Sequence, residues 1–228
     1  MGPGNAPVLI SADADLGHAA RSAVLSKSFD NGLICGAENN LVVEAGVRAS
    51  LIAELERHGA AVLTPEETAR FLGEAVDPQT GQFKPGIIGR DAATLAELAQ
   101  IQRRHPIQLL VIPTDLVAAE NCLAAEKLAP VLSLFTVAEA DEGLRVCRAL
   151  LDIDGSGHTA IIHARVWRRS AWTSSSRILR WRRPQTRSVA DNGRGTSAMI
   201  LPRSPIRVVI IGLNFFTPTV NSSAVAAP

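Results

Sequence analysis

Tyrosine is absent from the 228-residue chain, and aromatic residues make up only 4% of it, so large aromatic side chains contribute little to any core. Its three cysteines cannot form an even disulfide framework, which disfavours a small, disulfide-rich secreted fold. The sequence has no run of about 18 apolar residues and therefore predicts no transmembrane helix. Residues 1–5 lack the basic region and apolar run of a signal peptide. These absences predict a cytoplasmic protein.

Charge divides the chain into two parts. Residues 1–164 contain 12 Lys and Arg against 21 Asp and Glu, a net charge of −9. Residues 165–228 contain 11 Arg and a single acid, a net charge of +10, together with all three tryptophans. We therefore expect one domain over 1–164 and an Arg-rich, irregular and poorly ordered tail over 165–228. The abrupt change favours a frameshifted gene, and the alternative is a basic arm that binds nucleic acid through Arg and Trp.

Short apolar runs alternate with amphipathic segments through the first part of the chain. The pattern predicts strands at 8–10, 40–43, 61–64, 108–112 and after residue 130, and helices over 14–27, 46–57, 91–102 and 137–151, with a further helix that begins at 64. This alternation favours an α/β fold in which at least part of the sheet is parallel. The apolar run at 207–213 is also typical of a strand, but the sequence shows no obvious partner for it.

Two helix starts can be predicted from local residues. The sequence Thr-Pro-Glu-Glu at 64–67 has a capping threonine, a proline in the first helical position and a glutamate three residues after the cap. Ser11 or Asp13 is expected to cap the helix over 14–27.

Cys35 follows an Asn-Gly pair formed by Asn31 and Gly32. Asn-Gly favours a backbone with positive φ, so the chain is expected to reverse sharply there and to present the thiol on a loop. A cysteine that only fills a core would not need this turn. Cys122 and Cys147 are predicted to be such core residues, and no C-x-x-C pair or histidine cluster predicts a metal site.

Residues 27–38 read KSFDNGLICGAE, which resembles the nucleophile loop of the CoA-acylating aldehyde dehydrogenases, K-[ST]-F-D-N-G-x-[IV]-C-[AG]-x-E. Three other stretches resemble family segments in the same order, namely GPGNAP at 2–7, EKLAPVL at 126–132 and GSGHTAIIH at 155–163. The resemblance stops after residue 164. It implies a three-layer α/β/α catalytic domain of the aldehyde dehydrogenase type that is incomplete, because most of the family's nucleotide-binding domain precedes the first stretch. We therefore expect that the chain begins internally, at an alternative start codon.

The resemblance also implies a reaction. A small aldehyde, CoA and NAD or NADP would give acyl-CoA and NAD(P)H through a thiohemiacetal and a thioester on Cys35. Thiolate suits both steps, since it is a soft nucleophile and also a leaving group. Glu126 would contact the cofactor ribose, with a plain surface acid as the alternative. Asn31, Gly32, Glu38 and His158 would support the site, and Glu38 could equally pin the loop or be solvated.

Several alternatives stay open at this stage. A hydrolytic aldehyde dehydrogenase would release a free acid, although the F-D-N-G-x-I-C form speaks against it. A non-enzymatic product would be a degenerate fragment or an Arg-rich nucleic-acid-binding protein, although nucleic acid is not the expected partner. We expect this polypeptide by itself to be inactive. Full-length relatives in the family are homo-oligomers, and the sequence does not predict assembly here.

Overall fold

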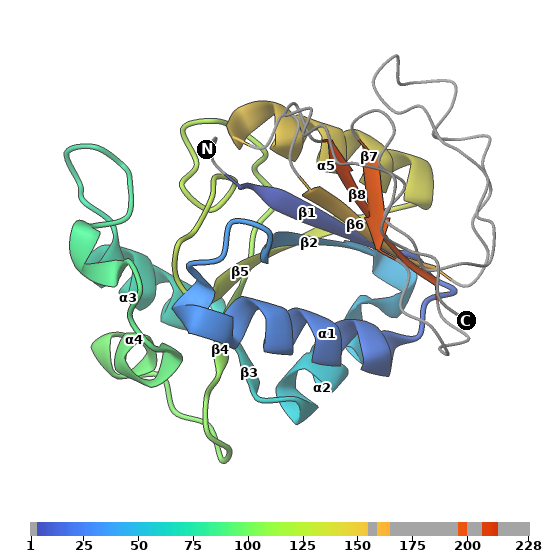
Figure 1. The fold of residues 1–228 in the computed structure, drawn as a ribbon. Helices are drawn as coiled ribbons and strands as arrows, with labels where there is room; N and C mark the ends of the chain where they lie inside the picture. Colours follow the sequence, from blue (N-terminus) through green and yellow to red (C-terminus); the bar gives the residue numbers. More distant parts are fainter. Residues whose placement is uncertain (1–3, 155–158, 165–195, 200–206, 214–228) are drawn as a thin grey trace, which may run out of the picture.

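A six-stranded parallel sheet forms the centre of the computed structural model, which describes residues 4–154, 159–164, 196–199 and 207–213 (Figure 1). The spatial order is β3-β4-β5-β2-β1-β6, and all five pairings are parallel. The strands are β1 (Ala6–Ile10), β2 (Glu38–Glu44), β3 (Ala60–Val62), β4 (Leu109–Pro113), β5 (Val131–Val137) and β6 (Thr159–Ala164). The α/β prediction with a parallel sheet is confirmed.

The run at 207–213 does have a partner. It forms β8 (Arg207–Leu213), which pairs antiparallel with β6, and β7 (Thr196–Met199) pairs antiparallel with β8. These two strands extend the sheet beyond β6. The sequence did not indicate this partner, because an antiparallel pairing between strands so far apart depends on which strand lies at the edge of the sheet.

Helices cover both faces of the sheet, as Figure 1 shows. α1 (Leu16–Ser28) and α2 (Arg48–Arg57) pack on one face, where they share a core with Val8 and Ile10 of β1. α5 (Ala140–Asp154) packs on the other face, where it shares a core with Leu9, the residue between Val8 and Ile10. Because side chains alternate along a strand, the buried strands supply apolar groups to both layers. The three-layer α/β/α prediction is confirmed. Among the described residues, no helix is long and apolar enough to cross a membrane.

Two predicted helix boundaries differ from the structure. Asp15, rather than Ser11 or Asp13, caps α1, because its carboxylate accepts a hydrogen bond from the backbone N–H of His18 at 2.9 Å. The helix predicted over 91–102 is shorter: α4 (Ala92–Leu98) ends just before Gln100, which has a φ of 54° and cannot continue a right-handed helix.

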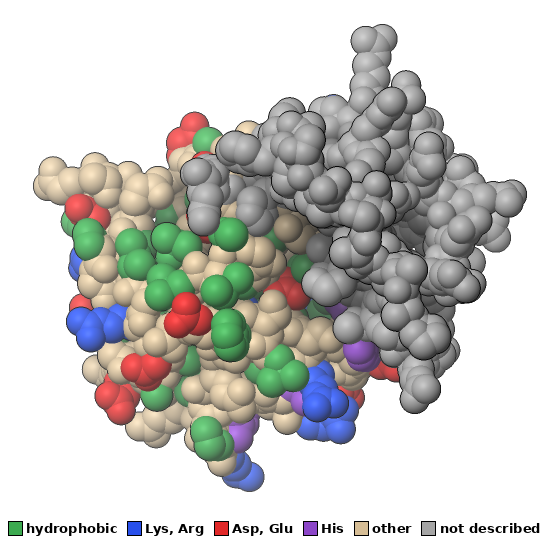
Figure 2. All heavy atoms as spheres, in the orientation of Figure 1, with side chains coloured by type: hydrophobic (Ala, Val, Ile, Leu, Met, Phe, Trp, Pro, Cys, Tyr) green, Lys and Arg blue, Asp and Glu red, His purple; other side chains and the backbone are tan. Residues whose placement is uncertain are grey.

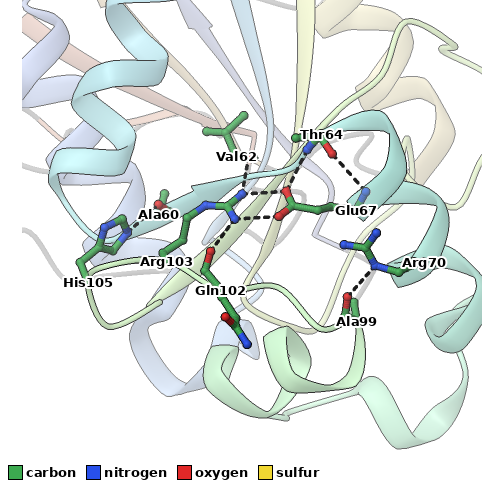
Figure 3. Close-up of polar contacts among 9 residues, drawn as sticks. All are labelled: Ala60, Val62, Thr64, Glu67, Arg70, Ala99, Gln102, Arg103 and His105. Atoms are coloured by element: carbon green, nitrogen blue, oxygen red, sulfur yellow. Dashed lines mark hydrogen bonds and ion pairs between the residues drawn. The ribbon is translucent and has the colours of Figure 1, made fainter.

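The capping box at Thr64 is confirmed and has an additional partner. α3 (Pro65–Ala75) starts at Thr64, whose hydroxyl accepts from the Glu67 N–H while the Glu67 carboxylate accepts from the Thr64 N–H. Arg103, in the loop after α4, forms two hydrogen bonds of 2.7 Å to the same carboxylate and donates to the Val62 carbonyl (Figure 3). One guanidinium thus joins the loop after α4 to α3 and β3.

Candidate functional site

The turn before Cys35 is a run of three left-handed residues. α1 ends at Ser28, and Asp30, Asn31 and Gly32 then have φ values of 49°, 51° and 75°. The sharp reversal predicted from Asn-Gly is therefore present, and it starts one residue earlier than the pair. Asn31 also fixes the turn, because its side-chain amide donates a 3.0 Å hydrogen bond to the carbonyl of Gly89.

Gly32 is pressed against the segment that leads into β5. A β-carbon at this position would lie 2.5 Å from the carbonyl carbon of Ala129 and 3.1 Å from the nitrogen of Pro130. Gly89, the acceptor for Asn31, in turn donates its N–H to the carbonyl of Leu128 at 2.8 Å. Two stretches of the predicted site, around Gly32 and around Ala129, thus meet in the fold although they are far apart in sequence.

Cys35 is exposed on the loop that joins this turn to β2, at the amino end of the parallel strands. The other two cysteines are buried, as predicted: Cys122 is 7% exposed and Cys147 is 3% exposed. Burial raises the pKa of the Cys122 thiol and raises the pKa of Cys147 to about 12, which keeps both protonated near neutral pH. All three cysteines lie in the described part of the chain, so Cys35 is the accessible candidate nucleophile.

A buried lysine that the sequence did not predict lies beneath the loop. Lys27, in the last turn of α1, is fully buried, and its Nζ donates to Asn39 Oδ1 at 2.9 Å and to the Lys127 carbonyl at 2.6 Å. Burial lowers its pKa to about 7, although the charges of Glu126 and Glu38 act in the opposite direction. A lysine is seldom fully buried without a specific set of partners.

Lys127 is a second buried lysine in the same region. Its Nζ donates to Asn40 Oδ1 at 3.1 Å and to the carbonyls of Leu123 and Ala125 at 2.8 Å each. Asn40 donates onward to Asn5 Oδ1 at 2.7 Å. Burial is also the main reason why the pKa of Lys127 is lowered. In the sequence, the one sign of a buried polar cluster was the pair Asn39 and Asn40 at the start of an otherwise apolar strand.

The two predicted glutamates have different environments. Glu38 is only 5% exposed at the start of β2, one of its carboxylate oxygens has no hydrogen-bond partner, and burial raises its pKa. Glu38 is therefore an interior acid rather than a solvated one. Glu126 is half-buried and lines a shallow hollow of about 140 Å³ together with Phe83, Ile87 and Leu128. Among the described residues, no group of three His, Cys, Asp or Glu is suited to a metal ion.

Comparisons with known proteins find similarity to aldehyde dehydrogenases. No protein-family model matches the chain. It is 32% identical to an aldehyde-alcohol dehydrogenase of Clostridium acetobutylicum, over 72% of this chain and 19% of that one. It is also 32% identical to a sulfoacetaldehyde dehydrogenase of Acholeplasma sp, over 72% of this chain and 34% of that one. The solved acetylating aldehyde dehydrogenase of Geobacillus thermoglucosidasius is 34% identical, with a TM-score of 0.67 over 72% of this chain and 36% of that chain. The matched region is homologous to the acylating aldehyde dehydrogenases.

The chain spans only part of these aldehyde dehydrogenases, 19% and 34% of the two curated relatives. Of the residues expected to act in such an enzyme, the structure gathers Asn31, Gly32, Cys35 and Glu38 on one loop and its continuation into β2. Glu126 lies in the segment that this loop contacts. His158 lies outside the described residues.

Exposed apolar side chains lie on and beside the loop that carries Cys35, the candidate nucleophile. Figure 2 shows hydrophobic side chains gathered on the face where α1 and the following loop lie in Figure 1. Among the exposed large hydrophobic residues, Phe29 is 66% exposed, Ile88 is 49% exposed and Ile34 is 43% exposed. We call Phe29, Leu33, Ile34 and Ile88 the apolar rim. Such a patch on the surface of a protein is typical of a binding or packing surface.

Proposed function

We propose that this chain is the cysteine-bearing part of an NAD(P)-dependent, CoA-acylating aldehyde dehydrogenase that acts on a small aldehyde. The observation that carries the proposal is the exposed Cys35 thiol, presented by a left-handed turn that is fixed through Asn31 and Gly32. Relatives support the chemistry by name: they include an acylating sulfoacetaldehyde dehydrogenase of Cupriavidus necator and an acetylating succinate-semialdehyde dehydrogenase of Clostridium kluyveri. A propionaldehyde dehydrogenase of Rhodopseudomonas palustris, 25% identical, was solved with CoA and an acylated cysteine.

In the proposed reaction, the Cys35 thiolate attacks the carbonyl carbon of the aldehyde and forms a carbon–sulfur bond. The backbone N–H of Cys35 is suited to stabilise the oxyanion that develops. Loss of a hydride from this adduct leaves a thioester on Cys35. CoA then attacks the thioester as a thiolate, after its thiol proton has passed to solvent, and Cys35 leaves as a thiolate, ready for another aldehyde. Cys35 is unpaired and exposed, as both attack and release require.

NAD(P)+ supplies the hydride acceptor when it is bound. The residues around Glu126 fit part of such a group, since a half-buried carboxylate can accept hydrogen bonds from ribose hydroxyls while Phe83 and Ile87 offer apolar contact. The three free thiols also agree with the reducing cytoplasm that we propose for this protein.

The isolated polypeptide is not expected to turn over aldehyde, because it spans 36% of the Geobacillus enzyme that it matches. We propose that the apolar rim is covered by further protein in an active enzyme. We also propose that residues 1–164 form the catalytic domain and that residues 165–228 are an Arg-rich, off-family tail.

A chimera tests the activity. Residues 4–164 would replace the matched segment of the Geobacillus acetylating enzyme, with the same chimera carrying Cys35→Ala as the control. Formation of acyl-CoA that depends on CoA, on NAD(P)+ and on Cys35 is the expected result. Release of a free acid without CoA would instead support the hydrolytic alternative. A chimera that folds and is equally active with and without Cys35 would refute the proposal.

A further inference from the structure

We propose that Lys27 is a positioning residue for the nucleophile loop, and that it acts through Asn39. A role for Lys27 in catalysis rests on the proposed function, whereas its role in holding the loop does not. Lys27 lies eight positions before Cys35 and has no contact with solvent, so it cannot itself bind an aldehyde. Its two hydrogen bonds instead reach the beginning of β2 and the segment before β5.

Asn39 is the point at which four segments join. Its Oδ1 accepts from Lys27 Nζ and from the Lys127 N–H, both at 2.9 Å. Its Nδ2 donates to the carbonyl of Gly4 at 2.8 Å and to that of Ala37 at 3.3 Å. Ala37 ends the nucleophile loop, and Gly4 packs directly against the backbone of Cys35. Asn39 therefore holds the loop from both sides, and Lys27 holds Asn39.

The partners of Lys27 explain why a lysine is suited to this position. Both acceptors are neutral oxygens, so the ammonium is held by hydrogen bonds without an ion pair at hydrogen-bond distance. The titratable groups around it are Glu38 of β2 and Glu126 before β5, whose charges raise its pKa, and Lys127, which repels Lys27 when both are charged. The balance of burial and these charges lowers the pKa of Lys27 to about 7. Since the folded pKa lies below the solvated value of about 10.4, an opening that hydrates Lys27 takes up a proton above pH 7, so the loop should be held more tightly above this pH than below it.

Hydrogen exchange of the full chain tests the proposal without substrate. The N–H groups of Leu33 and Ala37 bond within the loop, to Asp30 and Ile34, and so report on its order. Lys27→Met should lower their protection by about tenfold at pH 8, where the neutral amine keeps both hydrogen bonds, while amides of α3 keep theirs. In the wild-type protein, protection of these amides relative to α3 should begin to rise as the pH increases through about 7, and Lys27→Met should abolish this rise. Arg57→Met is the control, because the Arg57 side chain is 65% exposed on α2 and bonds to Glu54 rather than to the loop or to α3.

A second variant covers the case in which Lys27→Met does not fold. Asn39→Asp keeps an oxygen for Lys27 and Lys127 but removes the N–H groups that reach Gly4 and Ala37. The loop amides should lose protection to a similar extent, and the pH at which their protection begins to rise should move above 7 because a carboxylate beside Lys27 favours the ammonium. Wild-type protection in either folded variant would overturn the proposal. Since no turnover is measured, an inactive chimera would count against the proposed function and leave this result unaffected.

Discussion

The α-carbon of Gly4 lies against the backbone of Cys35, so closely that a β-carbon on Gly4 would be 2.9 Å from the α-carbon of Cys35 and 2.8 Å from its carbonyl carbon. Gly4 also accepts the hydrogen bond from Asn39. The stretch at 2–7 and the nucleophile loop were two separate points of resemblance in the sequence. In the fold, the stretch at 2–7 forms part of the support of the loop that carries Cys35.

Replacement of Gly4 by alanine should therefore displace the thiol-bearing loop. We expect Gly4→Ala to lower the free energy of unfolding by about 1–3 kcal/mol, because backbone atoms cannot move aside as a flexible side chain would. Gly36→Ala, one residue after the thiol, has nothing within 4 Å of the added methyl group and should be nearly neutral. Urea unfolding of both variants, together with the rate at which iodoacetamide alkylates Cys35, measures the effect. Equal stability and equal alkylation in the two variants would contradict the packing described here.

A second pair of glycines separates backbone strain from steric overlap. Gly32 and Gly81 have similar φ values, 75° and 70°, but only Gly32 has neighbours, the backbone atoms of Ala129 and Pro130. Gly81→Ala should cost about 1–2 kcal/mol of unfolding free energy from the left-handed conformation alone. Gly32→Ala should cost that amount plus the overlap, about 2–4 kcal/mol in all. If thermal unfolding gives the same loss for both, the close approach of Gly32 to Ala129 is not a constraint.

The sequence allowed prediction of those features that local residues determine. The capping box at Thr64 and the reversal at Asn31 depend on neighbours within a few positions. The buried strands could be recognised as apolar runs, and their alternation with helices indicated the parallel sheet. Family resemblance added the position of Cys35, which the structure places on the surface of a loop.

The support of the site could not be predicted in the same way. Lys27 and the Lys127 carbonyl are 100 positions apart, and both lysines belong to a residue type that is usually exposed. Only the fold brings them together and removes water from around them. The cap of α1 was misplaced for a related reason: three acceptable residues occur between 11 and 15, and the one used depends on where the turn after β1 ends.

The ion pair between Glu67 and Arg103 should contribute to stability in a pH-dependent way. The side chains are only 14% and 18% exposed, and hydrogen bonding to Arg103 lowers the pKa of Glu67 (Figure 3). A lowered pKa in the folded state means that the contribution is present above the unfolded value of about 4.3 and is lost as the pH falls through the folded value. We expect Arg103→Met to cost about 1.5–3 kcal/mol at pH 7 and much less at pH 3.

Arg57→Met is the matched control for that variant. Arg57 pairs with Glu54 on the outer face of α2, where its side chain is 65% exposed, so its loss should cost no more than about 0.5 kcal/mol. Urea unfolding of both variants at pH 7 and pH 3 gives the comparison. A loss for Arg103→Met that matches Arg57→Met, or that does not change with pH, would show that the bidentate pair does not stabilise the fold.

His163 should make the protein sensitive to mild acid. The sequence predicts a hydrogen-bonded core histidine, and the residue is indeed buried at 1% exposure, but its Nδ1 has no hydrogen-bond partner. Its ring meets the edge of the His18 ring at a centroid distance of 6.0 Å. Burial, reinforced by His18 and opposed by Asp15, lowers the pKa of His163 to about 4. The unfolded chain therefore binds the additional proton between about pH 6.5 and pH 4, and stability falls across that window as the pH decreases.

The expected size of this effect is about 1.4 kcal/mol per pH unit, or roughly 3 kcal/mol across the window. His163→Leu should flatten the dependence of unfolding free energy on pH by that amount, because leucine binds no proton in either state. Ile161→Val, two residues earlier on the same face of β6, removes one buried methyl group and should lower stability by about 0.5–1.5 kcal/mol equally at every pH. Chemical denaturation between pH 4 and pH 7 distinguishes the two. If the His163→Leu and wild-type curves stay parallel, the pKa of His163 is not lowered in the folded protein, and the burial argument is wrong.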